Sequence, residues 1–187
     1  MSDLTKKALA RALREQLEHK PLNKITVSDV TEQCGVNRKT FYYHFQDLYD
    51  LLEWIYTTEA IRVLDGKKDE DTWQQGFLQI LEYMRDNRAL VQNTYHSLSR
   101  ELLERYLYRE MYQLLRGVVD AKAEGLDVSE ADRASIAHFY KYAFVGLVLD
   151  WVQSGMKTEP AQLGQLVNTM MEGSIRSALE RFAGELR

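Results

Sequence analysis

The sequence predicts an all-α protein with a head of three short helices at its N-terminus and a helical bundle after it. Apolar residues recur with helical period in almost every segment, and no stretch alternates apolar and polar residues as a half-buried strand would. Only two prolines, Pro21 and Pro160, interrupt the 187 residues, which leaves room for long helices. With 45% hydrophobic residues the chain can fill a core, which excludes a disordered protein.

Caps and apolar stripes predict three short helices in the first quarter. The first helix stops before Pro21, because the residue ahead of a proline disfavours helical backbone. Thr26 and Asp29 have the spacing of a capping box, so a second helix begins there and ends near Gly35. Asn37 is a good N-cap for the third. The expected spans run up to Lys20, over 26–35 and over 38–45.

Caps and apolar stripes after residue 46 predict six further helices. Asp47 opens the first of them with a negative charge at the helix N-terminus. Gly125 breaks a long helix, and a second capping box over 129–132 opens the next one. Pro160 suits the first position of the last helix. The expected spans are 47–64, 72–85, 88–95, 97–123, 129 to about 151 and 160–182, which makes about nine helices in the chain.

Charge is divided unevenly along the chain, although the net charge is only −4. Residues 1–45 carry eight Lys/Arg against five Asp/Glu, a balance of +3, and the remaining residues have a balance of −7. We therefore expect an anionic partner such as nucleic acid to bind the first quarter. The single cysteine excludes a disulfide framework and a Cys₄ zinc site. Without a long apolar run or a signal-peptide pattern, we expect a cytoplasmic protein with no membrane partner.

The second and third helices have the form of a helix-turn-helix, because they are joined by a short turn that contains Gly35. With Phe41 and Phe45 on the buried edge of the third helix, Lys39 and Tyr43 point most directly away from the core. Basic, hydroxyl and aromatic side chains on one exposed face suit the major groove, where they bind base edges and phosphates. The candidates on this helix are Arg38, Lys39, Thr40, Tyr42, Tyr43 and His44.

The stretch from Thr26 to Asp47 resembles the DNA-binding core of the TetR/AcrR family of bacterial transcriptional regulators. Its most characteristic part is Gly-Val-x-x-x-Thr-Phe-Tyr-x-His-Phe over residues 35–45, and the likeness covers about residues 4–60. The resemblance implies a DNA-binding domain over 1–46 and an effector-binding and dimerisation domain over 47–187. It places Thr26 and Ser28 against the phosphate backbone, and Asn37 with the third-helix candidates in or beside the major groove. No cofactor or metal is implied.

Two positions depart from the family pattern. Many relatives have Arg at the position of Ser28 and Lys at the position of Leu48. Both differences remove a cation that would bind phosphate. We therefore expect either modest affinity for DNA or a larger contribution from the first helix, where Lys6 and Lys7 are the candidate contacts.

We expect a homodimer that binds a palindromic operator on double-stranded DNA, because two recognition helices discriminate far better than one. The expected interface lies on the last two helices, where small residues allow close approach and apolar residues supply buried area. Its candidates are Gly146, Leu147, Trp151, Met170, Met171, Gly173, Ser174 and Ile175.

An effector pocket between helices is also expected in the C-terminal domain. Amphipathic aromatic residues can line such a cavity, although most tyrosines at helical spacing are core residues with a solvent-exposed hydroxyl. We expect the effector to act through the helix over 47–64, with Tyr95 and His96 as candidate contacts across from it. The candidate pocket residues are Tyr83, Tyr95, His96, Tyr106, Tyr112, His138 and Tyr142.

The sequence does not determine the effector, nor whether the protein represses or activates transcription. Residues 138–156 resemble a subgroup that includes regulators of dihydroxyacetone kinase operons, in which a kinase-like protein can be the effector. The alternatives to a small-molecule effector are an activator with such a protein partner and an interaction module with weak DNA binding. An enzyme built around His96 or His138 is disfavoured, because no phosphate loop, nucleophile elbow or paired metal-ligand motif is present.

Overall fold

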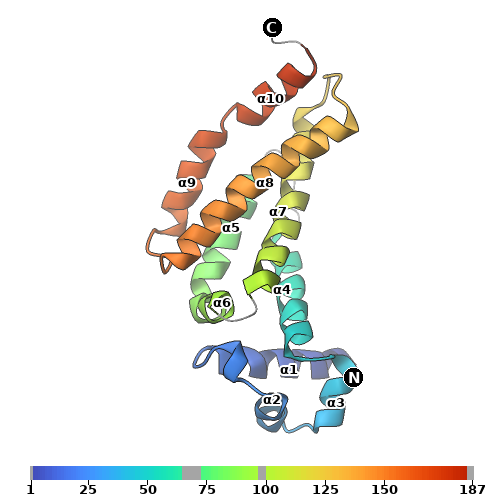
Figure 1. Ribbon diagram of the computed structural model, residues 1–187, viewed down its shortest axis with the longest axis vertical. Coiled ribbons are helices and arrows are strands. Elements are labelled where there is room, and N and C mark those ends of the chain that lie inside the picture. Colours follow the sequence, from blue (N-terminus) through green and yellow to red (C-terminus); the bar gives the residue numbers. More distant parts are fainter. Residues whose placement is uncertain (1, 65–72, 97–99, 185–187) are drawn as a thin grey trace. The chain divides into compact units, whose positions relative to one another are not determined.

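The computed structural model describes residues 2–64, 73–96 and 100–184, and every regular element in these ranges is a helix (Figure 1). The all-α prediction is therefore confirmed. The expected helix starts at residues 72 and 97 lie outside the described residues. The described helices are α1 (Ser2–Leu17), a short 3-10 helix (Leu22–Lys24), α2 (Val27–Cys34), α3 (Arg38–His44), α4 (Leu48–Leu64), α5 (Trp73–Asp86), α6 (Arg88–Tyr95), α7 (Arg100–Lys122), α8 (Glu130–Gln153), α9 (Pro160–Met171) and α10 (Ser174–Phe182).

The last helix expected from the sequence is two helices in the structure. The chain leaves α9 at Glu172, and Gly173 has a φ of +71°, in the left-handed region that side chains other than glycine rarely adopt. The Ser174 hydroxyl then donates to the carbonyl of Met171 at 2.9 Å and holds the bend. The described part of the chain therefore has ten α-helices where about nine were expected.

The described chain forms two compact units. The first comprises Met1–Ala60 and Asn87–Tyr106, and the second comprises Ile61–Asp86 and Leu107–Arg187. The first unit therefore contains α6 and the beginning of α7 in addition to the N-terminal helices. The functional division of the chain after residue 46 stays a prediction.

In the first unit, α1 runs across α2 and α3 (Figure 1). The α1 stripe of Leu9, Leu13 and Leu17 is fully buried, as is Phe41 of α3. The ring of Phe45, which ends α3, contacts the ring of Trp54 in α4 at 6.0 Å between centroids. The recognition-helix candidate is thus in contact with both α1 and α4.

Hydrogen bonds attach α6 to α1 and α4 within the same unit. The buried Tyr56 hydroxyl of α4 donates to Oγ1 of Thr94 at 3.0 Å, and burial raises the pKa of that hydroxyl. Asn93 donates to the carbonyl of Leu17 at the end of α1 at 2.6 Å. A displacement of α6 therefore acts directly on both helices.

We predict that Tyr56→Phe destabilises the protein by about 1 kcal/mol, because it removes a buried hydrogen bond and leaves Thr94 without that donor. Chemical denaturation measures the difference in unfolding free energy. Tyr49→Phe is the matched control, since Tyr49 lies on the same helix with 39% of its area exposed, and it should cost almost nothing. Equal losses in the two variants would contradict the proposed importance of the α4–α6 bond.

The second unit is built around α8. Phe144 lies in its centre, with ring contacts to Phe77 at 5.0 Å and to Trp73 at 6.0 Å, both from α5. Trp151 is also buried, and its indole donates to the carbonyl of Thr158 at 2.8 Å. Figure 1 shows α10 alongside the N-terminal part of α8, and the two helices are in contact. No helix in the described residues is long and apolar enough to cross a membrane.

Candidate nucleic-acid interface

The turn between α2 and α3 is fixed by local interactions. Gly35 ends α2 with a φ of +67°, and the amide of Val36 bonds the carbonyl of Thr31 at 3.0 Å. Asn37 caps α3, because its Oδ1 accepts from both the amide and the hydroxyl of Thr40, at 2.8 and 3.1 Å. These caps confirm the helix boundaries that the sequence predicts, and they set the direction in which α3 leaves the turn.

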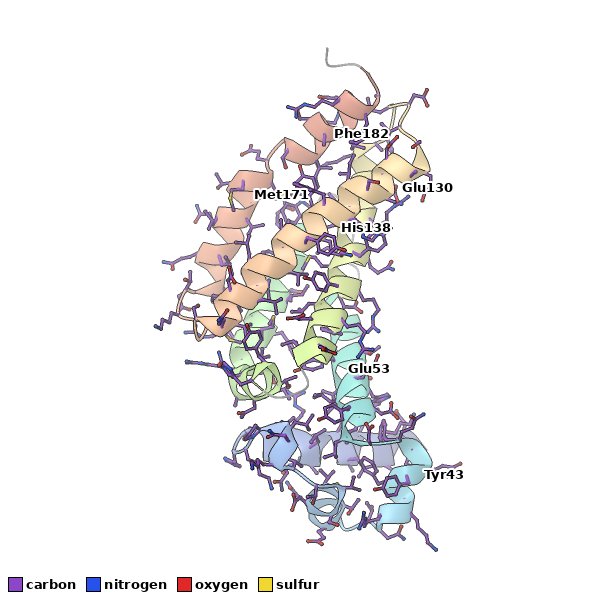
Figure 2. All side chains as sticks on the ribbon, in the orientation of Figure 1. Tyr43, Glu53, Glu130, His138, Met171 and Phe182 are labelled. Atoms are coloured by element: carbon purple, nitrogen blue, oxygen red, sulfur yellow. The ribbon has the colours of Figure 1, made fainter. Side chains whose placement is uncertain are left out.

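The exposed face of α3 is the one that the sequence predicts. Phe41 and Phe45 are buried, whereas Tyr43 exposes 81% of its area and Tyr42 exposes 51%. Figure 2 labels Tyr43 on this helix. Thr40 is half-buried, and its hydroxyl is engaged by the Asn37 cap. Of the other predicted contacts on the helix, the structure exposes Arg38 and Lys39 and half-buries His44.

Lys6 of α1 lies beside the end of α3. Its ammonium is 5.7 Å from the centroid of the Phe45 ring, and no ion pair holds it among the described residues. Lys7, by contrast, is paired with Asp3 at 2.5 Å. Of the two cations that the sequence proposes on α1, Lys6 is therefore the one whose charge is available to a phosphate next to the exposed face of α3.

The start of α2 contains the predicted capping box. Thr26 Oγ1 accepts from the amide of Asp29 at 3.1 Å, and the Asp29 carboxylate accepts from the amide of Thr26 at 2.8 Å. Thr26 is exposed and Ser28 is half-buried at this helix end. Leu48 is buried, so the position where many relatives have a cation contributes to the core here.

Asp29 should make the helix-turn-helix sensitive to acid. The Thr26 amide, and then the Lys20 ammonium at 3.2 Å, hold the pKa of Asp29 below its ordinary value. A carboxylate with a lowered folded-state pKa stabilises the fold above its unfolded value of about 3.9, and this contribution is lost as pH falls through the folded pKa. We expect Asp29→Asn to lower the melting temperature at pH 7 and to make little difference at pH 2. Glu32→Gln, an exposed charge change on the same helix, is the control; equal effects of the two would contradict the assignment.

The structure divides the predicted pocket residues between the two units. Tyr95, His96 and Tyr106 lie in the first unit, where Tyr106 stacks on Tyr56 with centroids 5.2 Å apart. One hydrogen bond between α4 and α6 joins Tyr56 to Thr94, a residue that was not among the sequence candidates. The roles of Tyr95 and His96 as effector contacts stay predictions. The remaining candidates, which belong to the second unit, are Tyr83, Tyr112, His138 and Tyr142.

Three of those second-unit candidates do come together, around a lysine that the sequence analysis missed. Tyr112 of α7 stacks on His138 of α8 with centroids 4.5 Å apart, and Lys141 lies over the Tyr142 ring at 4.3 Å. Tyr108 completes the group. Spacings of four residues on α7, and of three and four on α8, could have indicated these shared faces. No cluster of His, Cys, Asp or Glu in the described part could hold a metal ion.

Two predicted interface residues require correction. Trp151 and Ile175 are buried inside the second unit, with 5% and 2% of their area exposed, so they have almost no surface to offer a partner. Met170 exposes 54% of its area. Gly173 is exposed, and the half-buried candidates are Gly146, Leu147, Met171 and Ser174. Exposed apolar residues that the sequence analysis missed are Phe139, Leu166 and Phe182.

Comparison with known proteins gives two family matches and one curated relative. The family described as "Bacterial regulatory proteins, tetR family" matches residues 9–55, and "Transcriptional regulator C-terminal region" matches residues 71–173. The chain is 23% identical over 172 residues to the HTH-type dhaKLM operon transcriptional activator DhaS of Lactococcus lactis. That match covers 91% of this chain and 90% of the relative.

Solved structures give the same fold. The dihydroxyacetone kinase operon activator DhaS is similar with a TM-score of 0.73 and 20% identity, over 95% of this chain and 97% of that one. NalD, the secondary repressor of the MexAB-OprM multidrug efflux pump in Pseudomonas aeruginosa, is similar with a TM-score of 0.63 and 14% identity, over 92% and 96%. The matched family regions include the helix-turn-helix and more than half of the chain. The chain therefore belongs to the TetR family of bacterial transcriptional regulators.

Proposed function

We propose that this regulator acts as a homodimer whose two α3 helices bind a two-fold-symmetric operator in the cytoplasm of a bacterium. The observation that carries the proposal is the exposed face of α3, with Arg38, Lys39, Tyr42 and Tyr43 in solvent and Phe41 beneath them. Tyr42 meets the Phe41 ring edge to face, but half of its area is in solvent, as is most of Tyr43. Exposed aromatic and cationic side chains together suit groove edges and phosphates. The protein acts by binding and not as an enzyme.

The contacts with DNA divide into two kinds. The part of α3 that would enter the major groove contains Lys39, Thr40 and Tyr43. We assign these side chains to contacts with base edges. Lys6 and the start of α2, with Thr26 and Ser28, lie where they would face phosphates. Arg38, Asn37, Tyr42 and His44 complete the proposed interface on α3.

A titration of random-sequence duplex DNA at low salt tests the DNA-binding function itself. We expect binding whose affinity falls steeply as salt is raised, because phosphate contacts release counterions. Lack of binding even at low ionic strength would favour the second candidate in the same fold, an interaction module that has lost its DNA contacts. Leu48, a buried apolar residue at a position where many relatives carry a cation, is the observation behind that candidate.

We assign the dimer interface to the outer faces of α8 and α9. Phe139 on α8 exposes 70% of its area, and Leu166 and Met170 on α9 expose more than half of theirs. A Cβ added to Gly146 on α8 would meet nothing within 4 Å, so this position leaves room for close approach by another helix. A groove of about 460 Å³ between α8 and α10, bordered by Phe139 and Phe182, continues this apolar face and would receive side chains of the second copy.

The effector is proposed to act on α4. Within the first unit, Trp54 touches Phe45 at the end of α3, and Tyr56 binds Thr94 of α6. A ligand that favours one position of α4 over another would therefore displace α3, and one without such a preference would change nothing. The relative DhaS is named as an activator of the dhaKLM operon, which makes activation the alternative to repression. A kinase-like protein partner, which the resemblance of residues 138–156 implies, is the alternative to small-molecule control.

A further inference from the structure

A buried lysine in the second unit is surrounded by aromatic rings. Lys141 of α8 exposes only 8% of its area, and its ammonium lies 4.3 Å from the centroid of Tyr142, 5.4 Å from Tyr108 and 5.7 Å from Tyr112. Its Nζ also donates to Nδ1 of His138 at 3.0 Å. We call the rings of Tyr108, Tyr112, His138 and Tyr142 the ring cage. Figure 2 labels His138 on α8, next to α7.

Lys141 has no carboxylate partner among the residues that the structure describes. The contrast within the same unit is Arg116, which is also largely buried but binds Asp120 at 2.7 Å and Glu130 at 2.6 Å. A buried ammonium is costly unless it is paired, because the interior replaces its hydration poorly. Among the described residues, the negative faces of the tyrosine rings and one imidazole nitrogen are the groups that compensate this cation.

The ring cage is held together by contacts that do not involve the lysine. Tyr112 and His138 stack with an angle of 29° between their planes, and Tyr108 meets Tyr142 edge to face with centroids 5.4 Å apart. Each pair joins one ring of α7 to one ring of α8. The rings would therefore stay in place if the ammonium between them were exchanged for another.

We propose that the ring cage is a binding site for an alkylammonium ligand, and that Lys141 occupies it in the absence of that ligand. Ring faces attract any ammonium group, and methylated ammonium ions suit them best because they lose little hydration. Displacing Lys141 leaves no carboxylate unpaired and returns its charge to water. His138 and Tyr142 are exposed, so the site opens to solvent along α8. The ring cage lies on α7 and α8, whereas the proposed DNA contacts lie on α1 to α3.

Choline and its uncharged isostere 3,3-dimethylbutan-1-ol form a matched pair of probes for the cage. In the wild-type protein we expect choline, and not the isostere, to shift the NMR signal of the His138 ring, one of four histidines in the chain. His138→Gln identifies that signal. Absence of a choline-specific shift at His138 would overturn the proposal without requiring any other variant.

Calorimetry of two variants tests whether choline replaces the Lys141 ammonium in the ring cage. Lys141→Ala should bind choline roughly tenfold more tightly than the wild type, because no resident cation has to leave. Adding Tyr142→Leu should weaken choline binding by roughly tenfold, the size of one desolvated cation–ring contact. Equal affinity of the wild type and Lys141→Ala, or affinity unaffected by Tyr142→Leu, would show that the rings only pack α7 against α8.

Discussion

Lys39→Ala is expected to change which operator sequences the protein prefers, whereas Lys6→Ala is expected to weaken binding to all sequences alike. Lys39 is exposed on α3, where it would reach a base edge in the major groove. Losing such a contact costs about 1–3 kcal/mol and relaxes the preference at one base-pair position. Lys6 of α1 lies over the ring of Phe45 at the end of α3, where its ammonium would face a phosphate.

The two variants are compared by titrating the operator and its single-base variants at several salt concentrations. Lys6→Ala should lower the dependence of log affinity on log salt by roughly one, because one counterion fewer is released. Lys7→Ala is the matched control on the same helix, since Lys7 is already paired with Asp3. If Lys39→Ala only lowered the salt dependence and left the base preference intact, the assignment of Lys39 to base readout would be wrong.

Replacing Leu166 and Met170 together by Glu is expected to give a monomer that has lost most of its affinity for the operator. Both side chains are more than half exposed on α9, so the charges disturb the proposed interface without entering the core. Two linked recognition helices gain on the order of 100-fold or more over one, and the monomer loses this gain. Light scattering gives the oligomeric state, and fluorescence anisotropy with labelled operator gives the affinity.

A double charge change elsewhere separates the interface from the effect of added charge. Gln75→Glu with Gln113→Glu alters exposed residues on α5 and α7, and this variant should stay dimeric. If the Leu166 and Met170 variant remained a dimer, the interface would lie on another surface. A monomer with unchanged operator affinity would show that dimerisation does not determine DNA binding.

Local sequence signals predicted the helix-turn-helix well. The capping box at Thr26, the left-handed Gly35 and the Asn37 cap all involve residues within a few positions of one another, so their spacing alone determines the backbone. The exposed face of α3 follows from the positions of Phe41 and Phe45 in the same way. The break at Gly173 was also a local signal, although the sequence analysis gave it a role in helix approach only.

Features that depend on tertiary packing could not be predicted from the pattern. Trp151 is apolar at helical spacing whether it faces the core or a second subunit, and only the fold places it in the core. The grouping of α6 with the N-terminal helices depends on bonds such as Tyr56 to Thr94, which join residues far apart in sequence. Lysine is usually a surface residue, so its residue type alone predicts that Lys141 is exposed. It is buried because rings from α7 cover it, and the local sequence around Lys141 does not reveal those rings.

Selection of binding sites from a random pool of duplex DNA shows directly whether two α3 helices bind a symmetric operator. We expect the enriched sequence to be an inverted repeat whose half-sites are centred one helical turn apart, about 34–36 Å, or a multiple of that distance. The repeat should change at a defined position when the selection is repeated with Lys39→Ala. Enrichment of no sequence, or of one without two-fold symmetry, would contradict the account.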